Sequence, residues 1–104
     1  MNKVIRDGKV AVLYSPHYGA GWYTWTNKEE LLYDPVIVDM VLSEATTSEI
    51  QKYCEKTYGE LDFYYGGADR LTVEWIPVGT KFIIHEYDGY ESIWTEDSID
   101  WKVA

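Results

Sequence analysis

The chain has 104 residues, which is enough for one hydrophobic core and too few for two separate domains. Its 18 acidic residues against 9 lysines and arginines give a formal net charge of -9, which argues against binding to the backbone of nucleic acids and to anionic membranes. The single cysteine excludes an intramolecular disulfide and a cysteine-based zinc site.

The N-terminal part of the chain predicts a β-strand at residues 9–15, after an Asp7-Gly8 turn. Residues 1–6 can pair ahead of that turn as a short hairpin arm. Pro16 ends the strand, because proline lacks the N–H group that a β-ladder requires. We therefore expect the fold to begin with a buried strand.

Helical features begin after residues 19–26, which are predicted as loop or irregular strand. Asn27 is expected to cap a short helical turn over residues 28–32. Asp34 and Pro35 predict the start of the next helix, because an acidic N-cap precedes a proline at the first helical position.

A capping box of Thr46 and Glu49 predicts a further helix, which ends at Gly59. Cys54 lies on the apolar face of this helix. A buried, unreactive thiol is therefore expected there rather than a nucleophile.

The C-terminal third of the chain changes to the period-two alternation that is typical of strands, with Asp88-Gly89 as a hairpin turn. The expected strands are residues 71–76, 81–87 and 90–95, with a short fourth strand at 101–103. Residues 1–104 are therefore interpreted as a single α+β domain. An N-terminal strand and two or three short helices precede a C-terminal antiparallel β-meander, and the strands form one sheet.

The most distinctive stretch is residues 14–25, named here the aromatic loop, in which five aromatic rings, a histidine and two glycines follow the first strand. Such rings can stack on a planar base at roughly 1–3 kcal/mol per ring, while glycine backbone approaches a ligand closely. The alternative is that Trp22 and Trp25 pack over the sheet edge and the glycines only turn the chain. Neither a dinucleotide-binding fingerprint nor a P-loop is present.

Arg70 can meet the negative charge of a ligand, or it can pair internally with Asp69 or Glu74. Tyr64 and Tyr65 can add another ring pair beside it. The candidate ligand-binding residues are thus His17, Tyr18, Gly19, Gly21, Trp22, Tyr23, Trp25 and Arg70.

No Ser-His-Asp or Cys-His arrangement is recognisable, and the histidines lack the spacing of a metal site. His85, the second histidine, lies within a predicted strand and is expected to orient against a cross-strand partner. We therefore expect no catalytic residue, no metal and no cofactor, and consider an enzyme the weaker hypothesis.

Acidic residues concentrate in the C-terminal region from Glu86 onward, where the one lysine or arginine is Lys102. A solvated negative face is the simplest interpretation, and a basic partner protein would dock on it. The residues concerned are Glu86, Asp88, Glu91, Glu96, Asp97 and Asp100.

Four segments resemble a family of small phage and prophage proteins. They are residues 12–16, 19–25 (GAGWYTW), 74–80 and 87–91. The resemblance covers most of the chain, and it implies no established activity. A phage setting implies two roles by analogy: a sponge that sequesters a nucleotide-derived host immune signal, and an acidic inhibitor that binds a host nuclease or its nucleic-acid groove.

These observations favour a non-enzymatic protein that binds a nucleotide-type small molecule through the aromatic loop. On this hypothesis the Trp22→Ala variant loses its function while its fold survives. The alternative is an acidic protein-interaction module, an inhibitor or nucleic-acid mimic, that docks on a basic host protein.

The expected setting is the same for both hypotheses. The sequence has no apolar stretch of transmembrane length and begins without the apolar core of a signal peptide, so a cytoplasmic location is expected. The surplus of tyrosine and tryptophan over phenylalanine favours a homo-oligomer. The negative net charge predicts no direct contact with nucleic acid or membrane.

Overall fold

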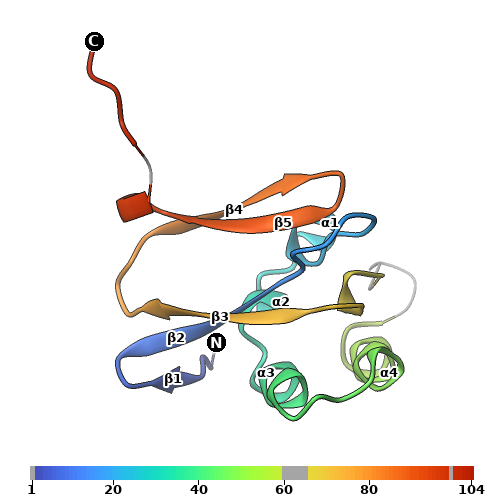
Figure 1. Ribbon diagram of the computed structural model, residues 1–104. Helices are drawn as coiled ribbons and strands as arrows, with labels where there is room; N and C mark the ends of the chain where they lie inside the picture. Colours follow the sequence, from blue (N-terminus) through green and yellow to red (C-terminus); the bar gives the residue numbers. More distant parts are fainter. Residues whose placement is uncertain (1, 60–65, 99) are drawn as a thin grey trace.

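The computed structural model describes residues 2–59, 66–98 and 100–104. Its elements are β1 (Ile5–Arg6), β2 (Lys9–Tyr14), α1 (Tyr23–Thr26), α2 (Glu30–Tyr33), α3 (Pro35–Leu42), α4 (Thr47–Tyr58), β3 (Thr72–Pro77), β4 (Phe82–Tyr87) and β5 (Tyr90–Thr95), with short 3-10 turns η1 (Gly66–Ala68) and η2 (Glu96–Ser98). This mixture confirms the α+β class. Figure 1 shows three layers: the β4–β5 hairpin above, the sheet of β1, β2 and β3 in the middle, and helices α3 and α4 below.

Strand β2 lies at the centre of the molecule. It pairs antiparallel with β1 and with β3, in a register that sets Val10 opposite Ile76 and Leu13 opposite Val73. Its run of residues 10–13 is apolar at every position, which is typical of a strand that is covered on both faces. The predicted first strand is thus confirmed, and its hairpin arm is confirmed over residues 5–6.

Alternate side chains of β2 reach two separate apolar clusters. On one face, Ala11 and Leu13 belong to a cluster with Ile37 of α3 and Ile50 of α4. On the opposite face, Val12 belongs to a cluster that includes α2 and the inner face of the β4–β5 hairpin. The central strand therefore stabilises the helices and the hairpin together.

Strands β4 and β5 form a sheet of their own, whereas the sequence predicts one sheet for all strands. Pro77 ends β3, and a turn closed by the Thr80 N–H and the Pro77 carbonyl, 3.1 Å apart, separates the two sheets. The hairpin then packs Phe82, Ile84 and Ile93 over the three-stranded sheet. Burial of this apolar face is the physical reason for the second layer.

Two predicted helix starts, at Asp34 and at Thr46, are confirmed. Asp34 Oδ1 accepts hydrogen bonds from the backbone N–H groups of Val36, at 2.9 Å, and Ile37, at 3.2 Å. The capping box of Thr46 and Glu49 is complete, and α4 ends at Gly59 as expected. These are local signals, in which the capping side chain and the capped amide lie within four residues of each other.

Three predicted segments differ in the structure. Residues 23–26, expected as loop or irregular strand, form the helical turn α1. Asn27 ends this turn in the left-handed conformation, with φ at 55°, instead of beginning the next helix. Residues 101–103, expected as a strand, belong to a C-terminal tail without regular structure that extends away from the body (Figure 1). No strand lies beside this tail to pair with it in the described part of the chain.

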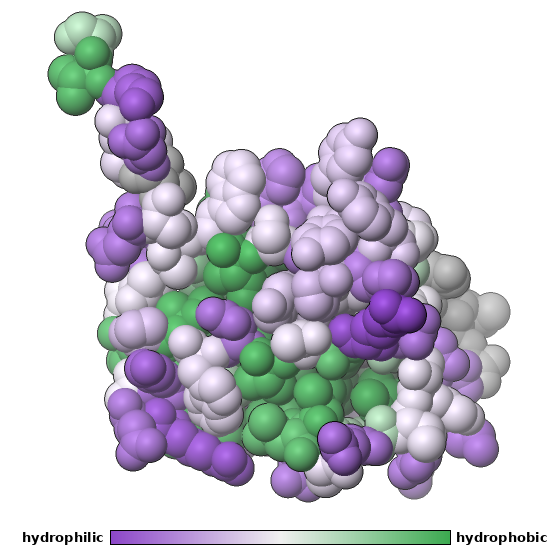
Figure 2. Space-filling view, viewed as in Figure 1, coloured by the Kyte–Doolittle hydropathy of each residue, from purple (hydrophilic) through white to green (hydrophobic). Residues whose placement is uncertain are grey.

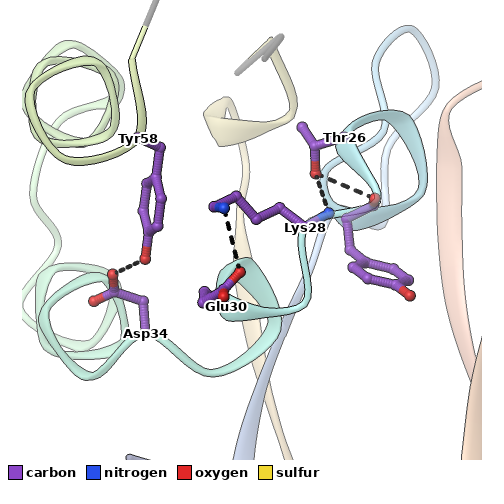
Figure 3. A network of polar contacts seen from close by, with 6 residues as sticks. Thr26, Lys28, Glu30, Asp34 and Tyr58 are labelled. Atoms are coloured by element: carbon purple, nitrogen blue, oxygen red, sulfur yellow. Dashed lines mark hydrogen bonds and ion pairs between the residues drawn. The ribbon is translucent and has the colours of Figure 1, made fainter. Parts of the chain in front are cut away.

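A carboxylate between α3 and α4 joins the two helices. Besides capping α3, Asp34 accepts hydrogen bonds from the hydroxyl of Tyr53, 2.9 Å from Oδ2, and from the hydroxyl of Tyr58. Figure 3 shows the Tyr58 hydroxyl directed at this carboxylate, with the separate Lys28–Glu30 ion pair nearby. Burial, followed by the hydrogen bond to Asp34, raises the pKa of both tyrosines.

Cys54 is buried on α4, as its position on the apolar face predicts. Burial, and then the charges of Asp34 and Glu55, raise the pKa of its thiol to about 12. The thiol therefore stays protonated at neutral pH and presents no surface to a reagent.

We expect the Tyr58→Phe variant to be about 1–2 kcal/mol less stable than wild type at neutral pH, because it removes a hydrogen bond to a charged acceptor. The pKa of Tyr58 is raised above 10.0 in the folded state. The wild-type advantage is therefore complete below the unfolded-state pKa of about 10 and is lost as the pH rises through the folded-state value. Urea denaturation of both proteins at neutral and strongly alkaline pH tests this expectation. A stability difference that stays constant with pH would contradict it.

Candidate functional site

The aromatic loop is packed against the body of the protein, and its central tryptophan belongs to the core. Trp22 has 0% of its surface exposed, and its Nε1–H donates to the Leu31 carbonyl at 2.7 Å. The ring belongs to the same apolar cluster as Leu13 and Leu31. The expectation that Trp22 presents its ring to a ligand is therefore wrong, and the packing alternative holds for this residue.

A buried carboxylate from the hairpin holds both ends of the loop. Glu91 is 0% exposed; its Oε1 accepts from the Ser15 N–H at 2.9 Å, and its Oε2 accepts from the Thr24 N–H at 2.9 Å and the Thr24 hydroxyl at 2.6 Å. Because Thr24 lies in the first turn of α1, Glu91 also satisfies an N-terminal amide of that helix. The expectation that Glu91 belongs to the solvated acidic face is wrong, since three hydrogen bonds replace its water.

Two glycines outside the loop, one in the hairpin turn and one in η1, allow the backbone of the loop to pack closely against them. A Cβ atom at Gly89 would lie 2.6 Å from the Ala20 nitrogen, and one at Gly67 would overlap the Gly21 carbonyl oxygen. A side chain at either position would therefore displace the loop. Gly21 is itself buried, so its backbone faces protein rather than a ligand.

The outer part of the loop lies over the tip of the hairpin. The Gly19 N–H donates to the Asp88 carbonyl at 2.9 Å, and Gly19 itself is exposed with φ at 115°. The Tyr18 ring is 60% exposed and lies 4.9 Å from the Tyr90 ring, centroid to centroid. His17, the residue before Tyr18, is half-buried.

The last two rings of the loop differ in their surroundings. Trp25 is partly exposed, and its Nε1–H donates to Glu86 Oε1 at 3.1 Å. Tyr23 packs against both apolar clusters of the core. The predicted ligand-binding residues therefore do not form one site, because Trp22 is in the core and Tyr18 lies on the hairpin.

Arg70 follows η1 as an exposed residue with φ at 68°. The ion pairs that the described residues form do not include it, so the expected pairing with Asp69 or Glu74 is not made. Tyr64 and Tyr65, the predicted ring pair, lie outside the described residues.

A cleft of about 640 Å³ lies between α2 and the start of β4, and we name it the α2–β4 cleft. It is open to solvent, and its lining includes the rings of Tyr23, Tyr33 and Phe82 and the side chains of Lys3 and Lys81. Its volume falls within the range of about 300–1,000 Å³ that small-molecule sites occupy. Among the described lining residues, Tyr23 is the one that the sequence predicts as ligand-binding.

The cleft gathers positive charge in an acidic chain. Lys3 Nζ lies 4.5 Å from the centroid of the Tyr33 ring, which is a cation–π contact. Lys81 lines the cleft directly before β4, and Glu29 is the one carboxylate among the described lining residues. Burial, and then the charge of Glu29, raises the pKa of Tyr33. The Tyr33 hydroxyl therefore remains a hydrogen-bond donor at neutral and mildly alkaline pH.

Sequence reasoning missed this cleft because its lining comes from separate segments. Lys3 precedes β1, Tyr23 and Tyr33 belong to α1 and α2, and Lys81 and Phe82 follow the turn after β3. No spacing pattern connects these positions. Composition gives no signal either, because lysine is not scarce in this chain and Lys3 has no aromatic neighbour in the sequence.

Comparisons with protein-family models, with curated proteins and with solved structures give no match. Within residues 2–59, 66–98 and 100–104, none of the helices has both the length and the apolar character needed to cross a bilayer. The geometry of the α2–β4 cleft is therefore the basis for assigning a function.

Proposed function

We propose that the chain binds, without catalysis, a small anionic ligand that carries a planar ring, such as a nucleotide, in the α2–β4 cleft. The observation that carries this proposal is the meeting of aromatic rings and two lysines at one cleft, in a chain with a net charge of -9. Small-molecule sites typically combine apolar and aromatic walls with a few polar groups that fix the ligand's orientation.

The lining residues divide naturally between the two parts of such a ligand. Tyr23 and Phe82 supply rings for a planar base, at roughly 1–3 kcal/mol per stacked base. Lys3 and Lys81 supply the positive charge for a phosphate, which lysine binds as a flexible point charge. The protonated Tyr33 hydroxyl adds a neutral donor.

Binding is favoured over catalysis by the same residues. The described lining of the cleft includes no histidine and no cysteine, and its one carboxylate is Glu29. General acid–base and nucleophilic mechanisms need paired groups within hydrogen-bond reach of each other. Stoichiometric sequestration of a nucleotide-derived signal, in the host cytoplasm if the protein is phage-encoded, is the role that fits such a site.

We expect AMP, which has one planar base and one phosphate, to bind the wild-type protein saturably in isothermal titration calorimetry. The Lys3→Ala and Lys81→Ala variants should each weaken AMP binding about 3–10-fold, because each removes a positive charge that faces the phosphate. Lys52→Ala is the matched control, since Lys52 is an exposed lysine on α4, across the three-stranded sheet from the cleft.

Adenosine separates the contribution of charge from that of stacking. It lacks the phosphate, so its affinity should be unchanged in the two lysine variants. Phe82→Leu, which keeps an apolar side chain and removes the ring, should weaken adenosine and AMP alike. Equal AMP affinity in Lys3→Ala, Lys81→Ala and Lys52→Ala, or no saturable binding at millimolar AMP, would contradict the proposal.

A further inference from the structure

The outward side of the β4–β5 hairpin carries an aromatic surface, which we name the outer hairpin face. Its members share one side because directly opposite residues of an antiparallel pair point the same way. They are Ile83, His85, Tyr87, Tyr90, Ser92 and Trp94, together with Tyr18 of the aromatic loop, which lies against them. The other side of the hairpin faces the core, so the described chain leaves the outer hairpin face uncovered.

The rings on this face are exposed and already held in place. Tyr87 is 65% exposed and Trp94 is 41% exposed. Tyr18 lies 6.5 Å from Tyr87 between ring centroids, and His85 stacks on Trp94 at 4.2 Å with 7° between the ring planes. The stack confirms the cross-strand orientation expected of His85. Rings that are fixed before binding lose little conformational freedom on binding.

The surface view agrees with this composition. Figure 2 shows side chains of intermediate hydropathy above the hairpin, whereas the strongly apolar area of the body lies mainly lower, over β3 and α3. Tyrosine and tryptophan have this mixed character and are enriched among the residues that dominate binding energy at protein interfaces.

Acidic side chains border the outer hairpin face. They are Asp88 at the hairpin tip, Glu96 and Asp97 in η2, and Asp100 in the tail, and all four are exposed. Two copies of this chain in a symmetric contact through the face would bring these carboxylates together. The charge therefore disfavours a second copy and favours a basic partner.

One end of the face is hollowed. A cavity of about 490 Å³ lies between Trp94 of β5 and Asp100 of the tail. The Lys102 ammonium pairs with Asp100 at 2.9 Å, so this carboxylate already accepts a cation. A guanidinium group that enters the hollow would meet an indole ring and a carboxylate, which are the two groups that arginine prefers.

We propose that the outer hairpin face docks an arginine-rich segment of a partner protein. The rings supply cation–π contacts and apolar area, the bordering carboxylates supply charge-assisted hydrogen bonds, and exposed patches of this kind are typical of interaction sites. The proposal rests on other observations than the α2–β4 cleft, with which the face shares Ile83. It gives a defined surface to the acidic interaction module that the sequence suggests, with the buried Glu91 excluded from it.

Fluorescence anisotropy with a fluorescein-labelled octa-arginine peptide tests the proposal. Wild-type protein should bind the peptide saturably, and Trp94→Ala and Tyr87→Ala should each weaken binding about tenfold. Trp101→Ala is the control, because Trp101 is also an exposed aromatic residue, 71% exposed, but lies in the tail and is not a member of the face. Its effect should stay below about twofold. Far-UV circular dichroism establishes that each variant is folded, and the two face variants keep the test usable if one of them is not.

Three results would overturn the proposal. The first is absence of saturable octa-arginine binding at low ionic strength. The second is equal affinity in wild type, Trp94→Ala and Tyr87→Ala, which would reduce the interaction to general attraction by net charge. The third is a wild-type dimer in analytical ultracentrifugation that Trp94→Ala converts to a monomer, which would show that a second copy covers the face.

Discussion

The Trp22→Ala variant is expected to lose about 3–5 kcal/mol of folding stability, the range found when a buried aromatic side chain is truncated. Trp22 is fully buried, so the substitution leaves a cavity beside Leu13 and Leu31. It also leaves the Leu31 carbonyl without the indole donor that lies 2.7 Å away. Urea denaturation followed by circular dichroism measures the loss.

Two further variants separate packing from hydrogen bonding. Trp22→Phe keeps an aromatic ring but removes the N–H donor, so it should cost less than Trp22→Ala. Trp25→Ala, at a partly exposed ring of the same loop, should cost about 1 kcal/mol or less. A Trp22→Ala protein as stable as Trp25→Ala would contradict the placement of Trp22 in the core.

The Glu91→Gln variant is expected to lose about 2–4 kcal/mol of stability, because a buried group loses partners that it cannot replace. The amide puts an NH₂ donor where an oxygen now accepts from Ser15 or Thr24, and the charge that strengthens all three hydrogen bonds disappears. Both ends of the aromatic loop should loosen. Chemical denaturation measures the stability, and hydrogen exchange at the Ser15 and Thr24 amides should be faster than in wild type.

Glu86→Gln is the control for this experiment. Glu86 lies directly opposite Glu91 in the hairpin, but it is exposed and accepts a hydrogen bond from the exposed ring of Trp25. Its substitution should change stability by about 1 kcal/mol or less. Equal stability of the two glutamine variants would show that Glu91 does not hold the loop.

Much of the fold could be predicted because its signals are local. Asp34 and Pro35 begin α3 through contacts within three residues, and the Thr46–Glu49 capping box acts over the same distance. The Asp88-Gly89 turn sets the register of the hairpin in the same way. In each case the residues that determine the helix start or the strand register are close neighbours in the chain.

The missed elements depend on distant partners. Helix α1 forms where a loop is expected, and its first turn is stabilised by Glu91, 67 residues away from Thr24. Strand alternation does place Glu91 on the same side as the inward-facing Ile93. A carboxylate at such a position is ordinarily expected at the surface, and only the folded loop shows which donors satisfy it.

The candidate site was predicted least well for the same reason. A surplus of tyrosine and tryptophan over phenylalanine is typical of rings that are partly exposed, as Tyr18, Tyr87 and Trp94 are. It does not distinguish a core ring such as Trp22 from an exposed one. The α2–β4 cleft exists only because the turn after β3 brings Lys81 across to α2.

The most direct test of the binding proposal is to map AMP onto isotope-labelled protein by NMR. We expect the largest chemical-shift changes at the amides of Tyr33, Thr80, Lys81 and Phe82, which line the α2–β4 cleft, and little change at residues 17–21 of the aromatic loop. Changes concentrated at residues 17–21 or on the outer hairpin face, or no changes at millimolar AMP, would contradict the assignment of ligand binding to this cleft.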